Sequence, residues 1–211
     1  AIIPSTELFD KQYELFWFRW NEQGTGVTFE YNERGHQVYR LLELSAETGK
    51  VRTVVEEKSN TFVNHQRMYR RFLKGGNELI WMSERDNWNH LYLYDYATGK
   101  VKNQITKGPW YVREVLHVDE DARQIYFTAS GVVGGKEDPY LIRYYRIGFD
   151  GKGLTCLTPE EGMHRAWFSG DMKYLVDVYS MVDKVPVAVL RSARDGKVVM
   201  PLETADITLL E

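Results

Sequence analysis

Short apolar segments recur along the chain at nearly constant spacing, and each is bounded by turn-forming residues. Their first residues lie 52, 46 and 49 positions apart, and the segments are residues 27–29, 79–81, 125–127 and 174–176. A Gly-Lys turn recurs at intervals of 50, 52 and 45 positions, and its glycines are Gly49, Gly99, Gly151 and Gly196. Two markers with the same period predict one structural unit repeated four times.

Each repeat is predicted to contain four antiparallel strands. The apolar segment follows an earlier apolar position and a turn, and it precedes a further strand such as HLYLYDY, the Gly-Lys turn and a final strand such as VRTVVE. Four strands in about 45 to 50 residues is typical of a β-propeller blade. No segment of ten or more residues has a helical period, which argues against strand-helix-strand units. We therefore predict an all-β fold of four propeller blades, at approximately 14–58, 59–108, 109–160 and 161–205.

One stretch of the second repeat, SERDNWNH, places Ser83, Asp86 and His90 close together in the sequence. These are the residue types of a hydrolytic triad, but here they surround the turn that closes the middle hairpin of the repeat. The chain also lacks Gly-x-Ser-x-Gly, the motif that exposes the nucleophile of an α/β-hydrolase. We therefore assign turn chemistry to this trio and predict no catalytic residue in the chain.

Composition supports the strand prediction and argues against several classes of partner. The 211 residues include 14 Tyr, 9 Phe and 6 Trp, which fit a pleated surface well. We expect Trp20, Trp81, Trp88, Trp110 and Trp167 in the core and between blades. The net charge is −3 and no run of Lys and Arg occurs, so nucleic acid is not an expected partner.

The sequence gives little indication of a metal site, a disulfide or a membrane-spanning segment. Cys156 is the single cysteine, which excludes an internal disulfide and a multi-cysteine metal site. The five histidines lack the paired spacing of metal ligands, and we predict no cofactor. No apolar run approaches the roughly 20 residues of a membrane span. The first residues, AIIPSTELFDKQ, have neither Met nor signal-peptide features, and we expect the chain to derive from a longer one.

Residues 81–110, WMSERDNWNHLYLYDYATGKVKNQITKGPW, resemble the propeller domain of the dipeptidyl peptidase IV family of serine peptidases. The resemblance extends through TFEYNERGHQVYRLLEL upstream and through QIYFTAS and GLTCLTPEEG downstream. It implies the second half of an eight-bladed propeller, with a Ser-Asp-His triad in a separate α/β-hydrolase domain. The implied role is to form part of the substrate chamber and to gate peptide access, while the hydrolase domain releases amino-terminal dipeptides after Pro or Ala. A periplasmic or extracellular location, with a peptide substrate bound through the hydrolase domain, is also implied.

The resemblance directs attention to residues 62–72, FVNHQRMYRRF, a basic and aromatic connection between the first and second repeats. In the family this connection faces the substrate cavity, so His65, Gln66, Arg67 and Tyr69 become candidate substrate-binding residues. Arg67 could donate hydrogen bonds to peptide carbonyls. A solvated connection anchored by its aromatic residues is the alternative.

Paired glutamates bind the amino terminus of the substrate in this family, and the chain contains two such pairs. Glu56–Glu57 and Glu160–Glu161 lack the family's surrounding residues, so we expect both pairs to be solvated.

Two other interpretations remain open. The chain could be a non-enzymatic periplasmic propeller that binds partner proteins, because propellers host many functions. A closed four-bladed propeller also fits the repeat count. If the chain is half of a larger propeller, its end blades expose faces that neighbours would cover, and we expect self-association or a mobile terminal blade.

Overall fold

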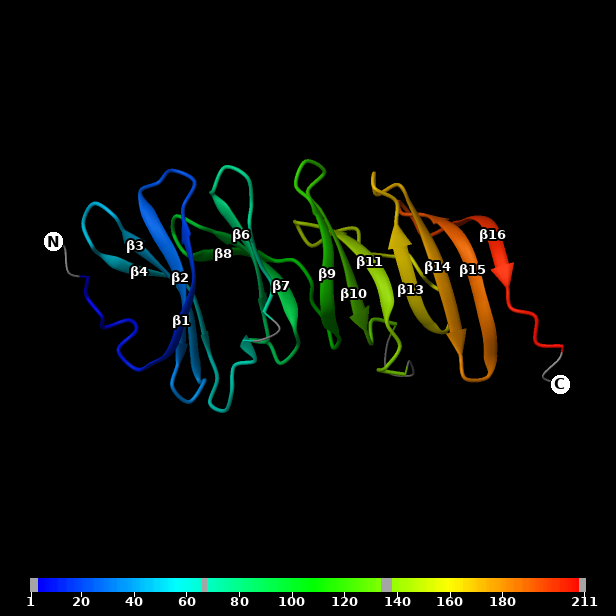
Figure 1. The fold of residues 1–211 in the computed structure, drawn as a ribbon, viewed down its shortest axis with the longest axis horizontal. Helices are drawn as coiled ribbons and strands as arrows, with labels where there is room; N and C mark the ends of the chain where they lie inside the picture. The colour runs from blue at the N-terminus through cyan, green and yellow to red at the C-terminus, as the bar shows by residue number, and fades with distance from the viewer. Residues whose placement is uncertain (1–3, 66–67, 134–137, 209–211) are drawn as a thin grey trace. The chain divides into compact units, whose positions relative to one another are not determined.

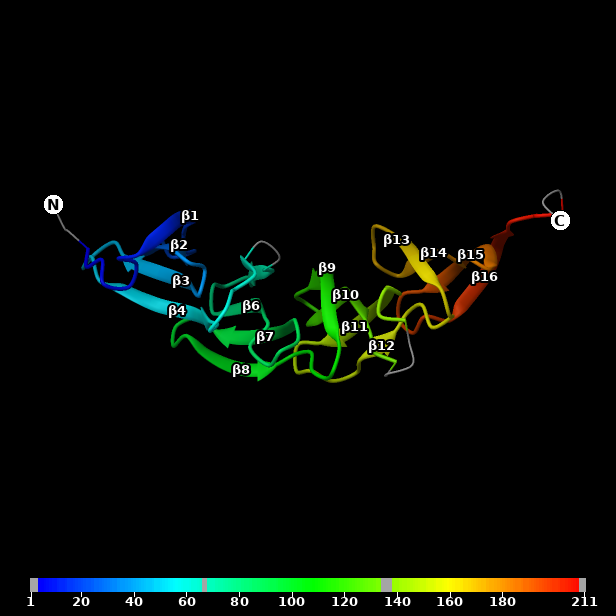
Figure 2. The same cartoon turned by 90° about the horizontal axis from the view of Figure 1, so that it is seen from below.

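The computed structural model describes residues 4–65, 68–133 and 138–208. Sixteen strands are assigned in this part of the chain, and they form four separate four-stranded sheets. Within each sheet the strands follow chain order and pair antiparallel, as Figures 1 and 2 show. The predicted all-β fold of four antiparallel, four-stranded repeats is therefore confirmed.

The chain divides into two compact units, Ala1–Gln104 and Ile105–Glu211, each with two sheets. The strands of unit 1 are β1 (Gln12–Trp20), β2 (Gly26–Glu33), β3 (Val38–Ser45) and β4 (Val51–Lys58), then β5 (Arg70–Phe72), β6 (Glu78–Ser83), β7 (His90–Asp95) and β8 (Lys100–Gln104). The strands of unit 2 are β9 (Tyr111–Asp119), β10 (Gln124–Ser130), β11 (Arg143–Gly148) and β12 (Thr155–Cys156), then β13 (Met163–Phe168), β14 (Tyr174–Met181), β15 (Lys184–Ser192) and β16 (Val198–Thr204).

Each unit buries an apolar core shared by its two sheets. In unit 1, Tyr39 and Leu41 of the first sheet pack with Leu79, Trp81 and Tyr94 of the second. A smaller cluster joins the sheets of unit 2, and its members are Tyr126, Leu157, Leu175 and Ala193. The second strand of each of the first three repeats is largely buried on both faces, as in β6 and β10, which explains its continuous apolar sequence. In the fourth repeat β14 is only partly buried.

The expected burial holds for two of the five tryptophans. Trp81 and Trp110 are buried, but Trp20, Trp88 and Trp167 are 59%, 39% and 59% exposed. Trp20 and Trp167 lie on β1 and β13, which are edge strands of their sheets, and Trp88 lies in the β6–β7 turn. An edge strand or a turn has fewer neighbours to cover a large ring, so the sequence pattern alone overestimated burial at these positions.

The Gly-Lys turns explain how the two sheets of unit 1 approach each other closely. Gly99 has a left-handed φ of 68°, and a Cβ at this position would lie 2.9 Å from the carbonyl oxygen of Val54. Arg52 of β4 donates to the carbonyls of Tyr96 and Ala97, both at 3.0 Å. We call this arrangement, a glycine turn against the preceding sheet with an arginine bound to the turn's carbonyls, the Gly-Lys clasp.

A carboxylate completes the clasp of unit 1. Glu43 of β3 accepts hydrogen bonds from the Tyr96 hydroxyl at 2.7 Å, the Asn21 amide at 3.0 Å and the Arg52 guanidinium at 2.7 Å. Burial opposes ionisation of Glu43, but the hydrogen bonds from Tyr96 and Asn21 and the charge of Arg52 outweigh it and lower the pKa of this carboxyl.

Unit 2 contains a clasp of the same kind. A Cβ on Gly196, whose φ is 74°, would lie 2.8 Å from the carbonyl oxygens of Cys156 and Leu157. Arg146 of β11 donates to the carbonyl of Arg194 at 2.6 Å. The recurrent glycine therefore serves the docking of one sheet on the next as well as the turn itself.

No helix in the described ranges has the length and apolar character needed to cross a bilayer.

Candidate functional site

A β-bulge in β1 turns two large aromatic side chains outward. Phe16 lies opposite Glu30 and Arg19 lies opposite Thr28, so Trp17 and Phe18 together oppose one residue of β2. Trp17 has a left-handed φ of 56°, which is costly for a bulky side chain. The two side chains are 67% and 63% exposed. Bulges of this kind often re-aim side chains next to functional sites.

Beside the bulge lies a groove of about 520 Å³, formed between β1 and the segment 68–72. Trp17, Phe18 and Arg19 line it from β1, and residues of β2 and β3 also contribute. The segment 68–72, which ends in β5, forms the other side. We call this the β1–β5 groove. Its volume lies within the range of sites that bind small molecules or short peptides.

A buried ion pair lies at the base of the groove. Glu30 is 1% exposed, and its carboxylate accepts hydrogen bonds from the Tyr39 hydroxyl and from Nε of Arg70. Burial raises the pKa of Glu30, while the bonds from Tyr39 and Arg70 partly oppose that rise. Burial, together with the charge of Glu30, raises the pKa of the Tyr39 phenol. The guanidinium of Arg70 also lies 4.4 Å from the ring centre of Trp17, so the buried pair fixes the exposed aromatic.

Two further arginines line the groove. Arg19 and Arg71 line it together with Arg70, whereas Glu30 is the acidic residue among the described lining residues. The Arg19 guanidinium lies 4.9 Å from the ring centre of Phe72, which holds it beside the opening. Arg70 itself is paired with Glu30.

The candidate residues predicted from the sequence fall in different places. Tyr69 lines the groove, and its carbonyl accepts from the Met82 amide at 2.9 Å. His65 instead stacks on His36 at 5.4 Å and on Tyr39 at 5.9 Å, with Nε2 3.4 Å from the Asn32 amide. Gln66 and Arg67 lie outside the described residues. Substrate binding by these four residues therefore stays a prediction.

Sequence reasoning missed most of the residues that line the groove. The signal was present in FWFRW, residues 16–20, where four of five consecutive side chains are aromatic. Such a run cannot alternate cleanly between a core face and a solvent face, so part of it must be exposed or the strand must be irregular. Here both occur, at Trp17 and Phe18.

The trio in the second repeat does not form a triad. The hydroxyl of Ser83 donates to Glu57 at 2.8 Å. Asp86 accepts from the Trp88 amide at 3.2 Å and the Gln104 side chain at 2.6 Å. His90 is fully buried and lies opposite Ser83 in the β6–β7 register. Ser83 and Asp86 have different partners, as expected for turn and strand chemistry.

The prediction that both members of the Glu56–Glu57 pair are solvated is wrong for Glu57. This residue is 6% exposed, and its carboxylate accepts from Nε1 of Trp81 at 2.9 Å and from Arg85 at 2.5 Å. Glu56 faces outward, where Arg40 and Lys58 lie at 2.6 and 2.8 Å. The partners of Glu57 come from the next sheet, which local sequence context does not reveal.

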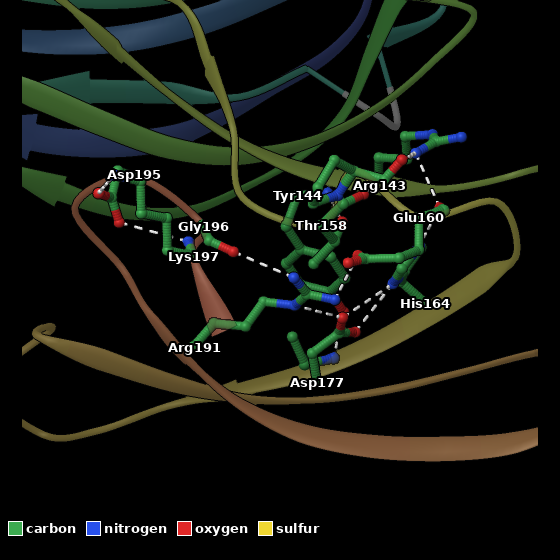
Figure 3. Close-up of polar contacts among 12 residues, drawn as sticks. Arg143, Tyr144, Thr158, Glu160, His164, Asp177, Arg191, Asp195, Gly196 and Lys197 are labelled. Atoms are coloured by element: carbon green, nitrogen blue, oxygen red, sulfur yellow. Dashed lines mark hydrogen bonds and ion pairs between the residues drawn. The ribbon is translucent and has the colours of Figure 1, made fainter. Parts of the chain in front are cut away.

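The second acidic pair divides in the same way. Glu161 is exposed and pairs with Lys184 at 2.5 Å. The Glu160 carboxylate accepts from buried Arg191 (Figure 3). Arg191 also donates to Asp177 at 2.8 Å, and both atoms are shielded from solvent. Glu160 is therefore only partly solvated, since its side chain is 36% exposed and pairs with Arg191.

Buried side chains also fix the connection that precedes β13. His164 is buried, with Nδ1 2.9 Å from Asp177 and Nε2 2.8 Å from the carbonyl of Glu160. Arg143 donates to the carbonyls of Thr158 at 3.2 Å and of Glu160 at 2.8 Å. These hydrogen bonds tie the connection to the sheets of unit 2.

No group of three or more His, Cys, Asp or Glu side chains in the described part of the chain is arranged to hold a metal ion.

Comparison with known proteins identifies relatives of this fold. "Dipeptidyl peptidase 4" of Trichophyton rubrum is 32% identical over 132 residues, which are 62% of this chain and 16% of that protein. The protein of the same name from Trichophyton equinum is 31% identical over 132 residues, with the same coverage. The chain thus spans about one sixth of the length of the curated relatives it matches.

Solved structures show the same similarity. A Bacteroides ovatus protein described as a dipeptidyl aminopeptidase IV superposes with a TM-score of 0.67 at 25% identity, covering 92% of this chain and 29% of that one. Porphyromonas gingivalis dipeptidyl peptidase 4 superposes with a TM-score of 0.68 at 21% identity, covering 92% and 26%. The family model described as "Dipeptidyl peptidase IV (DPP IV) N-terminal region" matches residues 1–186. The chain belongs to the family of dipeptidyl peptidase IV N-terminal regions.

Proposed function

We propose that this chain is a non-catalytic portion of the propeller of a dipeptidyl peptidase, and that it forms part of the wall of the substrate chamber. The observation that carries the proposal is the family match over residues 1–186, together with four consecutive four-stranded sheets. The four blades form half of an eight-bladed propeller, and a separate α/β-hydrolase domain supplies the triad. The 211 residues contain no Gly-x-Ser-x-Gly, which is consistent with catalysis elsewhere.

The β1–β5 groove supports a role in contacting peptide. It lies between the first strands of two consecutive sheets, and aromatic and arginine side chains line it. Aromatic rings supply apolar contact area, and arginines donate to carbonyl and carboxylate oxygens. A chamber wall with such grooves would admit extended peptides and exclude folded proteins, which is how the propeller would gate access.

Activity of a longer protein tests this proposal. A protein that contains this chain and its hydrolase domain should release p-nitroaniline from amino-terminal Xaa-Pro and Xaa-Ala substrates, whereas the 211-residue chain should not. The matched control is the same protein with its nucleophilic serine replaced by alanine. A correctly folded, full-length protein without dipeptidyl peptidase activity would instead favour a non-enzymatic propeller that binds partner proteins.

We also propose a periplasmic or extracellular location, which rests on the family alone. Fractionation of the source cells, with antibodies raised against the 211-residue chain, tests it. Recovery only with cytoplasmic markers would contradict the proposal.

A further inference from the structure

We propose that Glu30 is a pH-sensitive latch for the β1–β5 groove. When its carboxylate takes up a proton it releases Arg70, and Arg70 then no longer holds the ring of Trp17 in place beside the groove. The latch regulates the groove, whose contact with peptide rests on the proposed function.

Glu30 lies where strands from the two sheets of unit 1 meet. It belongs to β2 and is 1% exposed, while its partners Tyr39 and Arg70 come from β3 and β5. The carboxylate accepts from the Tyr39 hydroxyl and from Nε of Arg70. The side chain of Arg70 is 17% exposed and lines the groove. The ion pair therefore connects a buried carboxylate directly to the surface of the groove.

Arg70 transmits the charge state of Glu30 to Trp17. Its guanidinium lies 4.4 Å from the centre of the Trp17 ring, so the group that neutralises Glu30 also supports this ring. Trp17 sits on the β-bulge of β1 and is 67% exposed. A movement of Arg70 removes the cation–π contact, and the ring that lines the groove can then change its position.

A proton on Glu30 weakens the attraction that holds Arg70. A neutral carboxylic acid can keep its hydrogen bond with Tyr39, but it no longer neutralises the guanidinium. A charge shielded from water without a counter-ion is costly, so the guanidinium turns towards the groove. Burial raises the pKa of Glu30, although the bond from Tyr39 and the charge of Arg70 oppose the rise. Release is therefore expected above the ordinary value of 4.5.

The direction of this pKa change also means that the latch opens in a folded chain. The folded chain binds the proton of Glu30 more readily than the unfolded chain does. The contribution of Glu30 to the free energy of unfolding therefore grows as the pH falls through the raised pKa. Glu30 does not itself drive acid unfolding, so the groove can change while the sheets stay intact.

Other charged and titratable groups act on the latch from the elements around it. These are Glu14 and Arg19 on β1, Tyr39 on β3, Arg70 and Arg71 on β5, and His65 in the connection before β5. His65 stacks on Tyr39 at 5.9 Å, and a histidine can also change its charge between about pH 5 and pH 8. The experiment must therefore separate Glu30 from His65.

An NMR titration of the 211-residue chain from neutral to acidic pH tests the latch without any hydrolase activity. The signals are the indole N–H of Trp17 and the Nε–H of Arg70, assigned with Trp17→Phe and Arg70→Lys. Both signals should shift together in one transition, with a midpoint above pH 4.5. Circular dichroism should not change over the same transition.

Variants assign the transition to Glu30. Glu30→Gln keeps the shape of the side chain but cannot ionise, so it should show the acidic signal positions at neutral pH and no transition. Tyr39→Phe removes a hydrogen bond that lowers the pKa of Glu30, so the midpoint should rise; this holds the proposal to a test even if Glu30→Gln does not fold. Glu56→Gln is the matched control, because Glu56 is exposed and pairs with Arg40 and Lys58, and it should leave the transition unchanged.

Several results would overturn the proposal. A transition that persists in Glu30→Gln but disappears in His65→Phe, which keeps an aromatic ring on Tyr39, would assign the switch to His65. A Trp17 signal that does not depend on pH, or a loss of the circular dichroism signal at the same midpoint, would remove the latch. A working latch in a full-length protein without peptidase activity would contradict the proposed function alone, so the two ideas fail separately.

Discussion

Replacing Asp177 with asparagine is expected to destabilise unit 2 and leave unit 1 unchanged. Asp177 is fully buried, and its two oxygens accept from His164 at 2.9 and 3.1 Å and from Arg191 at 2.8 Å. Asn has nearly the same volume, so the substitution removes the charge without opening a cavity. It also directs the amide N–H₂ of asparagine, which is a donor, towards His164 or Arg191, which are themselves donors. Arg191 would keep Glu160 as its remaining carboxylate partner, and that side chain is 36% exposed.

The magnitude follows from the cost of breaking a buried ion pair. Removing one partner leaves an uncompensated buried charge, which costs about 3–5 kcal/mol. Domains are stable by only about 5–15 kcal/mol, so the loss is a large fraction of the total for this unit. The residual bond of Arg191 to Glu160 places the expected value near the lower end, at about 3 kcal/mol.

Hydrogen–deuterium exchange followed by mass spectrometry measures the protection of backbone amides in each unit separately. Amides of β14 and β15 should lose protection in Asp177→Asn, while amides of β2 and β6 serve as the internal reference. Asp183→Asn, an exposed carboxylate in the β14–β15 turn, is the matched control and should change little. The double variant Asp177→Asn/Arg191→Gln should be less unstable than the sum of the two single variants, because the two residues share one interaction.

The reasoning would be refuted if Asp177→Asn matched Asp183→Asn in protection, or if β2 and β6 lost protection to the same extent as β14 and β15. The first outcome would mean that the buried pair contributes little net stability. The second would mean that the two units do not unfold independently.

Three other measurements follow from the fold. Gly99→Ala should lower the free energy of unfolding by about 1–3 kcal/mol more than Gly24→Ala in urea titrations, because both glycines have a φ of 68° but only Gly99 faces a carbonyl within 4 Å; equal losses would reject the clasp. Glu43 has a lowered pKa, so its contribution is present above its ordinary value of 4.5 and lost as the pH falls through the lowered value. Glu43→Gln should therefore cost about 2 kcal/mol at pH 7, and the difference from the parent chain should shrink below pH 4.5. The 211-residue chain should self-associate through its end sheets, and Val199→Lys with Met200→Lys on exposed β16 should reduce the mass measured by light scattering; a monomeric parent chain would contradict this.

The repeat architecture was predictable because its signals are local. Apolar strands recur with one period, and the glycines of the four Gly-Lys turns, Gly49, Gly99, Gly151 and Gly196, all have left-handed φ values between 68° and 78°. A turn that requires such a conformation selects glycine, so the position can be read from sequence alone. Strand order within each sheet then follows, because short turns join consecutive strands into antiparallel neighbours.

The environment of individual charged residues could not be read in this way. Glu57 receives its partners Trp81 and Arg85 from 24 and 28 residues further along the chain, and Glu160 receives Arg191 from 31 residues away. An acidic pair at a strand end looks the same in sequence whether it meets water or an arginine from the next sheet. The bulge at Trp17 was missed for a related reason. The extra residue in the strand is visible in the sequence only as a run of aromatic residues that does not alternate with polar residues.

The Gly-Lys clasp has a consequence for how such repeats diverge. Its acceptors are main-chain carbonyls, those of Tyr96 and Ala97 in unit 1 and of Arg194 in unit 2, so these hydrogen bonds do not depend on which side chain the accepting residue carries. In unit 1 the side chain of Tyr96 adds a second contact, because its ring lies 5.2 Å from the Arg52 guanidinium and its hydroxyl donates to Glu43. The elements common to the two clasps are therefore the glycine and the arginine. Successive blades can therefore accumulate substitutions on their surfaces and still pack against their neighbours in the same way. Repeats with the same fold can then differ in function, so that one has a groove on its surface and another does not.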